Sequence, residues 1–523
     1  MDLAFVAVTM ARRGLLRPGP PARVLAQLNA LRRWGFSLAG ELRQAAARHP
    51  DRIAVLDERR GTTTYAELLD RAERLARAWQ VDGLGPGDRI GVLCRNHGGL
   101  IEAVLAATMI GADPVLANTG LPAPQLAAVA AEQRLRVLVH DAELADLTVS
   151  LPPEVTRLTE GDLDALIERT AAGRLAPPVR QGRTIVLTSG TTGTPKGARR
   201  RTPGGPGPLC SIIGRIPLHA GDRIMIAAPL FHTWGYAGLQ VALALGATIV
   251  LQHRFEPGPA IDALHRHRCT GLIAVPVMLQ RLLDAGAPTR RPPLRAVAVS
   301  GSALPGGLAT RFMDAYGDVL HNLYGSTEAS WASIATPAEL RRDPHTAGRP
   351  PRGTRVAILD DAGRPVPAGT VGRIFVGNDM LFEGYTTGAG RERHDGLLGT
   401  GDLGHLDADG LLFVAGRDDD MVVSGGENVF PSDVERLIAG LPGVREVAVV
   451  GVPDAEFGRR LAAYVVLDPG AVPDPEAVRE HVRRERPRYY VPRDVVYLPD
   501  LPRNATGKVL TRDLPAPSPG GQA

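Results

Sequence analysis

Lysine is almost absent from this sequence. Of 60 lysine and arginine residues only Lys196 and Lys508 are lysine, so the other 58 (60 minus 2) are arginine. Lysine carries a compact point charge on a thin, flexible stem, whereas arginine carries a broad planar group. Both lysines lie in stretches rich in glycine and threonine, TSGTTGTPKG and RNATGK. We therefore expect these two positions to need the smaller cation.

Cysteine, long apolar runs and net charge are also scarce. The three cysteines, Cys94, Cys210 and Cys269, show no metal-ligand spacing, which argues against a zinc site and fits a reduced cytoplasmic setting. No apolar run is long enough to span a membrane. A net charge of +4 over 523 residues, with no basic run interleaved with aromatics, argues against nucleic acid as a partner. The basic run at 199–201 is expected on a solvated loop.

The N-terminus does not read as a signal peptide, because its basic pair follows the apolar run instead of preceding it. Residues 22–35 show the pattern of an amphipathic helix. Packing on the body of the protein is the default expectation, and peripheral contact with the inner face of the membrane is the alternative.

The spacing of apolar residues predicts the organisation of the chain. Helical periodicity at 37–50 and 65–80 alternates with short β-rich runs at 88–94, 136–140 and 184–189, and the alternation continues to about residue 302. This pattern is typical of α/β units with mainly parallel sheets. From about residue 350 the pattern changes to strand and turn, which predicts antiparallel hairpins. After about residue 423 a helix followed by two strands predicts a small α+β unit.

The segment TSGTTGTPKG, at 188–197, has the composition of a phosphate-binding loop. Glycines allow backbone N–H groups to approach an anion closely, and five hydroxyls and Lys196 add donors. It is not a Walker A loop, because Pro195 precedes the lysine and Gly197 follows it.

This loop resembles that of the adenylate-forming ligase superfamily, which includes acyl-CoA and aryl-CoA synthetases. The resemblance continues in order through NLYGSTEAS at 322–330, TAGRPPRGTRVAILD at 346–360, the segment 399–435, and PRNATGK at 502–508. It implies an α/β fold: an N-terminal adenylation domain at 1–417, with a β-rich subdomain at about 350–417, and a small mobile α+β C-terminal domain at 418–523.

The resemblance also implies two half-reactions. A carboxylate attacks the α-phosphate of ATP to give acyl-AMP and pyrophosphate, and coenzyme A then displaces AMP. Mg²⁺ would accompany ATP. Rotation of the C-terminal domain about Asp419 would exchange Lys508 for a coenzyme A tunnel at Gly425 and Gly426.

Site residues follow from the resemblance position by position. The implied catalytic residues are Lys508, Thr327, Glu328 and His232, with Glu328 also binding the metal. The implied ATP and AMP site comprises Thr188, Ser189, Gly190, Thr191, Thr192, Gly193, Lys196, Gly301, Ser302, Ala303, Tyr324, Gly325, Ser326, Asp402 and Arg417.

The class of the carboxylic acid substrate is inferred from the stretch AAPLFHTWGYAGLQVALALGA, at 227–247. This stretch is apolar and contains no acidic partner for an amino group of a substrate. A medium- or long-chain fatty acid is the favoured substrate, and an aryl acid is the nearest alternative. A second alternative is an acyl-AMP ligase that loads a carrier protein instead of coenzyme A.

Overall fold

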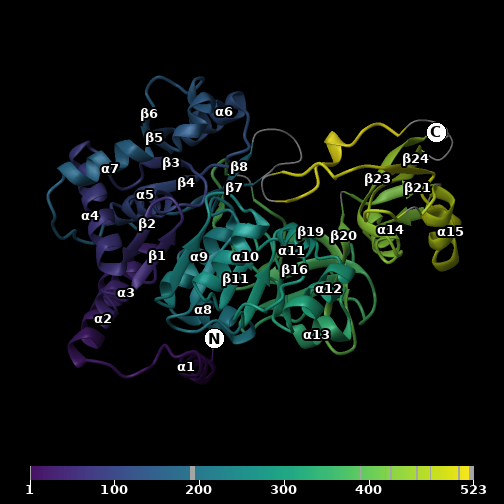
Figure 1. Cartoon of the computed structure of the whole chain (residues 1–523), viewed down its shortest axis with the longest axis horizontal. Helices are drawn as coiled ribbons and strands as arrows, with labels where there is room; N and C mark the ends of the chain where they lie inside the picture. Colours follow the sequence, from purple (N-terminus) through teal and green to yellow (C-terminus); the bar gives the residue numbers. More distant parts are fainter. Residues whose placement is uncertain are drawn as a thin grey trace.

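The computed structural model describes residues 2–188, 195–388, 390–418, 420–424, 427–454, 458–471, 473–504 and 507–517. Two large sheets and their covering helices form the first three quarters of the chain, and smaller β-rich and α+β units follow (Figure 1). The expectation of an α/β fold with mainly parallel sheets is confirmed.

The first large sheet has eight strands, of which the six central ones are parallel and one antiparallel strand lies at each edge. Its six central strands are buried almost throughout, as expected for a sheet covered on both faces, whereas the edge strand β2 is partly exposed. Their order across the sheet is β14 (Ser333–Ala335), β13 (Leu320–Tyr324), β12 (Ala296–Val299), β11 (Gly271–Ala274), β9 (Arg223–Ile226), β10 (Thr248–Leu251), β1 (Ile53–Asp57) and β2 (Gly61–Thr64).

The second large sheet has seven strands, and its first two pairings are antiparallel. The edge strand β17 comes from the stretch predicted to be β-rich hairpins, so that stretch also contributes to this sheet. The order is β17 (Gly384–Tyr385), β8 (Lys196–Arg199), β7 (Ile185–Thr188), β4 (Asp113–Leu116), β3 (Arg89–Leu93), β5 (Leu135–His140) and β6 (Thr156–Thr159).

Helices begin where the sequence supplies caps. Ser37 accepts a hydrogen bond from the Gly40 N–H at the start of α3, and Thr64 and Glu67 form a capping box at the start of α4. The helices of this part of the chain are α1 (Leu3–Arg12), α2 (Pro21–Trp34), α3 (Leu38–Arg48), α4 (Tyr65–Val81), α5 (Gly98–Met109), α6 (Ala123–Gln133), α7 (Glu160–Arg169), α8 (Gly207–Arg215), α9 (Thr233–Ala244), α10 (Pro257–Arg266), α11 (Pro276–Asp284), α12 (Gly306–Tyr316) and α13 (Pro337–Arg342).

The amphipathic helix predicted at 22–35 is α2. It packs along α3, while Leu25 and Leu28 on its other face are exposed. Among the helices that the structure describes, none is both long and apolar enough to cross a membrane. Contact with a membrane surface stays a prediction.

An antiparallel sheet follows the large sheets. Its strands are β15 (Arg355–Leu359), β16 (Gly372–Gly377), β18 (Arg393–His394), β19 (Leu397–Leu406) and β20 (Leu412–Arg417). The last part of the chain forms the predicted α+β unit, which lies at one end of the molecule in Figure 1. It contains β21 (Val422–Ser424), β22 (Glu427–Val429), α14 (Pro431–Ala439), β23 (Val444–Asp454), β24 (Gly458–Leu467), α15 (Pro475–Glu485) and β25 (Asp494–Tyr497).

Two of the contacts between the α+β unit and the large part of the chain lie near Lys508 or at the end of α11. Arg445 forms an ion pair with Asp284 at the end of α11, with a 2.5 Å separation between Nη2 and Oδ2. Gly507 lies against Val275 and Val277. Because Lys508 is the next residue, this second contact places the lysine beside the large sheets.

Candidate active site

A single cavity of about 390 Å³ joins Lys508 to the N-terminal helices. This volume is within the usual range for a small-molecule site. Nine of the predicted site residues line the cavity: Thr188, His232, Gly301, Gly325, Ser326, Thr327, Glu328, Arg417 and Lys508.

Thr327 and Glu328 follow β13, the strand that carries Tyr324. The Thr327 hydroxyl lies 2.8 Å from the hydroxyl of Thr233, the first residue of α9. Glu328 is 6% exposed, and its Oε1 accepts a 2.5 Å hydrogen bond from the Tyr385 hydroxyl. Arg391 lies 3.5 Å from the same oxygen. A buried carboxylate is thus held in place at the cavity wall.

Asp402 lies behind this wall with Tyr324. The Tyr324 hydroxyl donates a 2.5 Å hydrogen bond to Asp402 Oδ2, and Arg417 Nε lies 3.8 Å from Oδ1. Burial raises the pKa of Asp402, while the bond from Tyr324 and the charge of Arg417 oppose that rise. Tyr324, Asp402 and Arg417, which are far apart in the sequence, therefore form one group beside the cavity.

Most of the predicted phosphate loop lies outside the described residues. Ser189, Gly190, Thr191, Thr192 and Gly193 lie outside the described residues, as do the predicted hinge Asp419 and the predicted tunnel glycines Gly425 and Gly426.

On either side of residues 189–194, Thr188 ends β7 and Lys196 begins β8. The two residues are paired across these antiparallel strands. The Lys196 ammonium is exposed and lies 5.8 Å from the centre of the Tyr385 ring. Ser302 and Ala303 lie beside Gly301 in the loop after β12, outside the cavity lining.

Lys508 stands at the end of a tight turn. Its backbone N–H donates to Asn504 Oδ1 at 2.9 Å, and its carbonyl accepts from the Asn504 N–H at 2.9 Å. Gly507 has a φ of +82°, and a Cβ at this position would lie 2.5 Å from Val277 Cγ1. Only glycine satisfies both constraints, so the glycine before Lys508 allows the lysine to approach the cavity.

His232 caps the start of α9 and lines the cavity. Burial lowers the pKa of its imidazole to about 4, so the ring is neutral at physiological pH. A neutral imidazole contributes a polar edge to the cavity without adding positive charge.

Arg200 was missed by the sequence analysis, and the prediction of a solvated basic run at 199–201 is wrong at this position. Arg200 is 5% exposed, lines the cavity, and donates a 2.8 Å hydrogen bond from Nη1 to the Thr327 carbonyl. It follows β8, in which Ala198 is also buried. The period-2 alternation of a strand placed both side chains on the same inner face, and that signal was available in the sequence.

Glu41 and Gln44 on α3 were also missed. Both line the end of the cavity that lies away from Lys508. Gln44 Nε2 donates to Glu41 Oε2 at 3.3 Å and to the Ala244 carbonyl at 3.2 Å, and Gln27 Nε2 of α2 donates to Gln44 Oε1 at 2.6 Å. Burial raises the pKa of Glu41 to about 8. The polar residues of the predicted helix at 37–50 were available as a signal, because they share a face with Leu38 and Leu42.

Replacing Glu41 by glutamine is expected to raise the free energy of unfolding relative to the wild type, and this difference should grow as the pH rises. Between pH 4.5 and about 8 the unfolded chain releases the Glu41 proton while the folded chain keeps it, so the free energy of unfolding falls across this window. Glutamine removes this loss, which is on the order of 4 kcal/mol at pH 8. Thermal unfolding at pH 5 and pH 8 measures it, and a difference in Tm that is equal at both values would contradict it. Glu154→Gln, at an exposed position, serves as the control.

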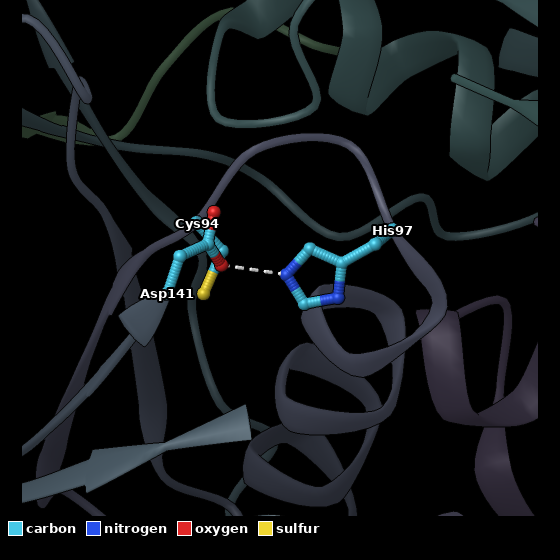
Figure 2. Close-up of side chains that lie close together, drawn as sticks. All are labelled: Cys94, His97 and Asp141. Carbon is cyan, nitrogen blue, oxygen red and sulfur yellow. Dashed lines mark hydrogen bonds and ion pairs between the residues drawn. The ribbon is translucent and has the colours of Figure 1, made fainter. Parts of the chain in front are cut away.

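A second cluster of reactive side chains is structural. Cys94, His97 and Asp141 are buried and lie close enough together to suggest a metal site (Figure 2). However, His97 Nδ1 accepts from the Gly99 N–H at 3.1 Å, which leaves Nε2–H to donate to Asp141 Oδ1 at 2.7 Å. Asp141 Oδ2 accepts from the Arg95 N–H. Both imidazole nitrogens are therefore engaged, one in capping α5 and the other in a bond to Asp141, the residue that follows β5.

The chain matches two family models. The model described as AMP-binding enzyme covers residues 42–386, and the model described as AMP-binding enzyme C-terminal domain covers residues 433–508.

Curated relatives and a solved structure agree with these matches. The chain is 32% identical to a feruloyl-CoA synthase of an Amycolatopsis species, over 86% of this chain and 93% of that one. It is 34% identical to a 2-succinylbenzoate–CoA ligase of Geobacillus kaustophilus, over 90% and 96%. The o-succinylbenzoate CoA synthetase of Bacillus subtilis, solved with its acyl-adenylate intermediate, superposes with a TM-score of 0.81 at 27% identity, covering 92% of this chain and 99% of that one. The chain therefore belongs to the AMP-binding, adenylate-forming enzyme family.

Proposed function

We propose that this enzyme is an aryl-acid–CoA ligase. The carboxylate of an aryl acid attacks the α-phosphate of ATP, which gives aryl acyl-AMP and releases pyrophosphate. The aryl acyl group is then transferred to the thiol of coenzyme A with release of AMP. The observation that carries the proposal is the cavity that joins Lys508, Thr327 and Glu328 to an apolar channel whose far end is lined by the N-terminal helices. The apolar channel suits a hydrophobic acid, and the relatives named above act on feruloyl and succinylbenzoate groups.

The polar end of the cavity performs the first half-reaction. Lys508 places its ammonium between the acid carboxylate and the α-phosphate, and so offsets the negative charge that develops as the new bond forms. Thr327 and Arg200 fix the wall opposite, since Arg200 holds the Thr327 carbonyl. Asp402 accepts hydrogen bonds from the ribose of the nucleotide, and Tyr324 and Gly301 border the base.

Glu328 fits a magnesium site, because Mg²⁺ prefers one carboxylate oxygen together with substrate phosphates and Glu328 presents a buried carboxylate at the cavity wall. The ion would neutralise phosphate charge. For the second half-reaction, we propose that residues 418–523 rotate about Asp419 relative to residues 1–417, which would bring Gly425 and Gly426 to the cavity for coenzyme A.

A fatty acid remains the second candidate, and the apolar lining contributed by Ala237, Val241 and Ala244 favours it. The acceptor is a separate question. Transfer to a carrier protein would leave the adenylation site unchanged and would alter the second step alone.

A product assay tests the proposal. The protein is incubated with ATP, Mg²⁺ and a panel of aryl, fatty and amino acids, with and without coenzyme A, and the products are identified by mass spectrometry. We expect aryl-CoA and AMP only when coenzyme A is present. Turnover of fatty acids alone would overturn the choice of acid, and accumulation of acyl-AMP despite coenzyme A would overturn the choice of acceptor.

A further inference from the structure

One face of α9 runs along the channel. Thr233, Trp234, Ala237, Gly238, Gln240, Val241 and Ala244 all line the cavity and recur at helical spacing. The rise of an α-helix puts Ala244 about 16 Å from Thr233. Since Thr233 touches Thr327 at the reacting end, α9 separates the carboxylate end of the channel from its far end by roughly this length.

The far end is built largely by residues that precede the matched family region, which starts at residue 42. Helices α1, α2 and α8 line it, and its apolar side chains include Met10, Leu15, Leu31, Leu38, Leu209 and Ile212. Helix α1 is fixed on α8 by a 2.8 Å hydrogen bond from Arg13 Nε to the Ile213 carbonyl.

A polar group interrupts this apolar end. Gln27, Glu41 and Gln44 line the cavity and hydrogen-bond in series, and Gln44 also donates to the carbonyls of Leu243 and Ala244 at the end of α9. Among the described residues, no arginine, lysine or histidine forms an ion pair with Glu41. Glu41 is half-buried at the cavity wall. Placing a carboxyl group in apolar surroundings is costly unless hydrogen bonds compensate, and the only side-chain bond that the described residues give Glu41 is one of 3.3 Å.

We propose that Glu41, with Gln27 and Gln44, recognises a hydroxyl group at the end of the acid opposite its carboxylate. This inference rests on the proposed acid–CoA ligase function and deepens it by naming a feature of the substrate. A hydroxyl both donates and accepts, so it can donate to a Glu41 oxygen and accept from a neighbouring amide. Glu41 and its partners are positioning and specificity residues, since the reacting atoms lie at the other end of α9.

A hydroxyl fits the cluster better than either a methyl group or an ammonium group. An acid that ended in a methyl group would leave Glu41 with a single weak partner inside an apolar channel. An ammonium group would need an ionised carboxylate, and the apolar residues around Glu41 disfavour its charged form. The acid should therefore be elongated and hydrophobic, with a neutral polar tip.

Matched pairs of acids test the proposal. Each pair differs only in a hydroxyl at the end opposite the carboxyl group, and pairs are drawn from aryl acids and from straight-chain acids. The ratio of kcat/KM within a pair is measured for the wild type and for Glu41→Leu. We expect the wild type to prefer the hydroxylated acid by roughly tenfold or more and Glu41→Leu to abolish or reverse the preference, mainly through KM.

The ratio within a pair is insensitive to partial loss of folded enzyme, because both acids meet the same active fraction. Glu41→Gln should keep most of the preference, Gln27→Leu should reduce it, and the exposed control Glu154→Gln should not change it. Equal use of both acids by the wild type, or a preference that survives in Glu41→Leu, would overturn the proposal. Preference for an amine-ended acid over the hydroxylated one would also overturn it. If only the straight-chain acids were turned over, the assignment of an aryl acid would be overturned. The ratio of kcat/KM within the straight-chain pairs would still decide the role of Glu41.

Discussion

Replacing Lys508 by alanine is expected to lower the rate of acyl-adenylate formation by roughly a hundredfold to a thousandfold. The physical reason is the loss of the positive charge that we place at the developing negative charge of the α-phosphate. The cavity supports this position, because Lys508 lines it together with Thr327 and Glu328 while the turn at Asn504 and Gly507 holds the lysine backbone. Exchange of labelled pyrophosphate into ATP, driven by the acid, measures this half-reaction.

The second half-reaction separates a catalytic role from a general loss of structure. Synthetic acyl-AMP and coenzyme A should give acyl-CoA at close to the wild-type rate in Lys508→Ala, because no adenylation is required. Lys508→Arg should recover little adenylation, since the planar guanidinium does not fit a site for a point charge. Arg512→Ala removes a charge from an exposed position nearby and serves as the control. An equal fall in both half-reactions would contradict the assignment.

The fold was predictable because its signals are local. Buried parallel strands such as β3, β9 and β11 appear as short apolar runs between helical patterns, and each reports its own burial without reference to distant residues. The antiparallel strands β15 and β16 are likewise marked by turns. The position of β17 was not predictable, since it leaves this region to pair with β8, and that pairing depends on a contact nearly 200 residues apart in sequence.

The reacting end of the cavity was predicted from motifs, whereas its far end was not. Motifs such as YGSTE and NATGK place several functional groups within a few residues. Each motif can therefore be identified in the sequence without knowing which distant residues lie beside it. Within the described part of the chain, the Glu41 side chain hydrogen-bonds to Gln44 of its own helix, and its proposed role depends on the cavity walls that α2, α8 and the end of α9 supply. Arg200 was misjudged for a related reason, because a run of three arginines hides the alternation that buries the middle one.

Replacing Glu328 by glutamine is expected to lower acyl-adenylate formation by roughly a hundredfold and to raise the concentration of Mg²⁺ needed for half-maximal rate. Glutamine keeps the size of the side chain and can still accept from Tyr385, so the wall of the cavity should be preserved. What it removes is the negative charge that a hard cation requires. Titration of Mg²⁺ at saturating ATP in the pyrophosphate-exchange assay gives both quantities.

Two further variants separate the charge of Glu328 from its placement. Tyr385→Phe leaves the carboxylate and removes the 2.5 Å hydrogen bond that fixes it, so a smaller loss, about tenfold, is expected with little change in the Mg²⁺ requirement. Glu392→Gln changes a carboxylate whose side chain is about half exposed and pairs with Arg373, and it should leave both quantities unaltered. If Glu328→Gln and Tyr385→Phe lower the rate equally and neither shifts the Mg²⁺ titration, then Glu328 acts by supporting the cavity wall. A metal-binding role requires the shift in Glu328→Gln alone, because only that variant removes the ligand charge.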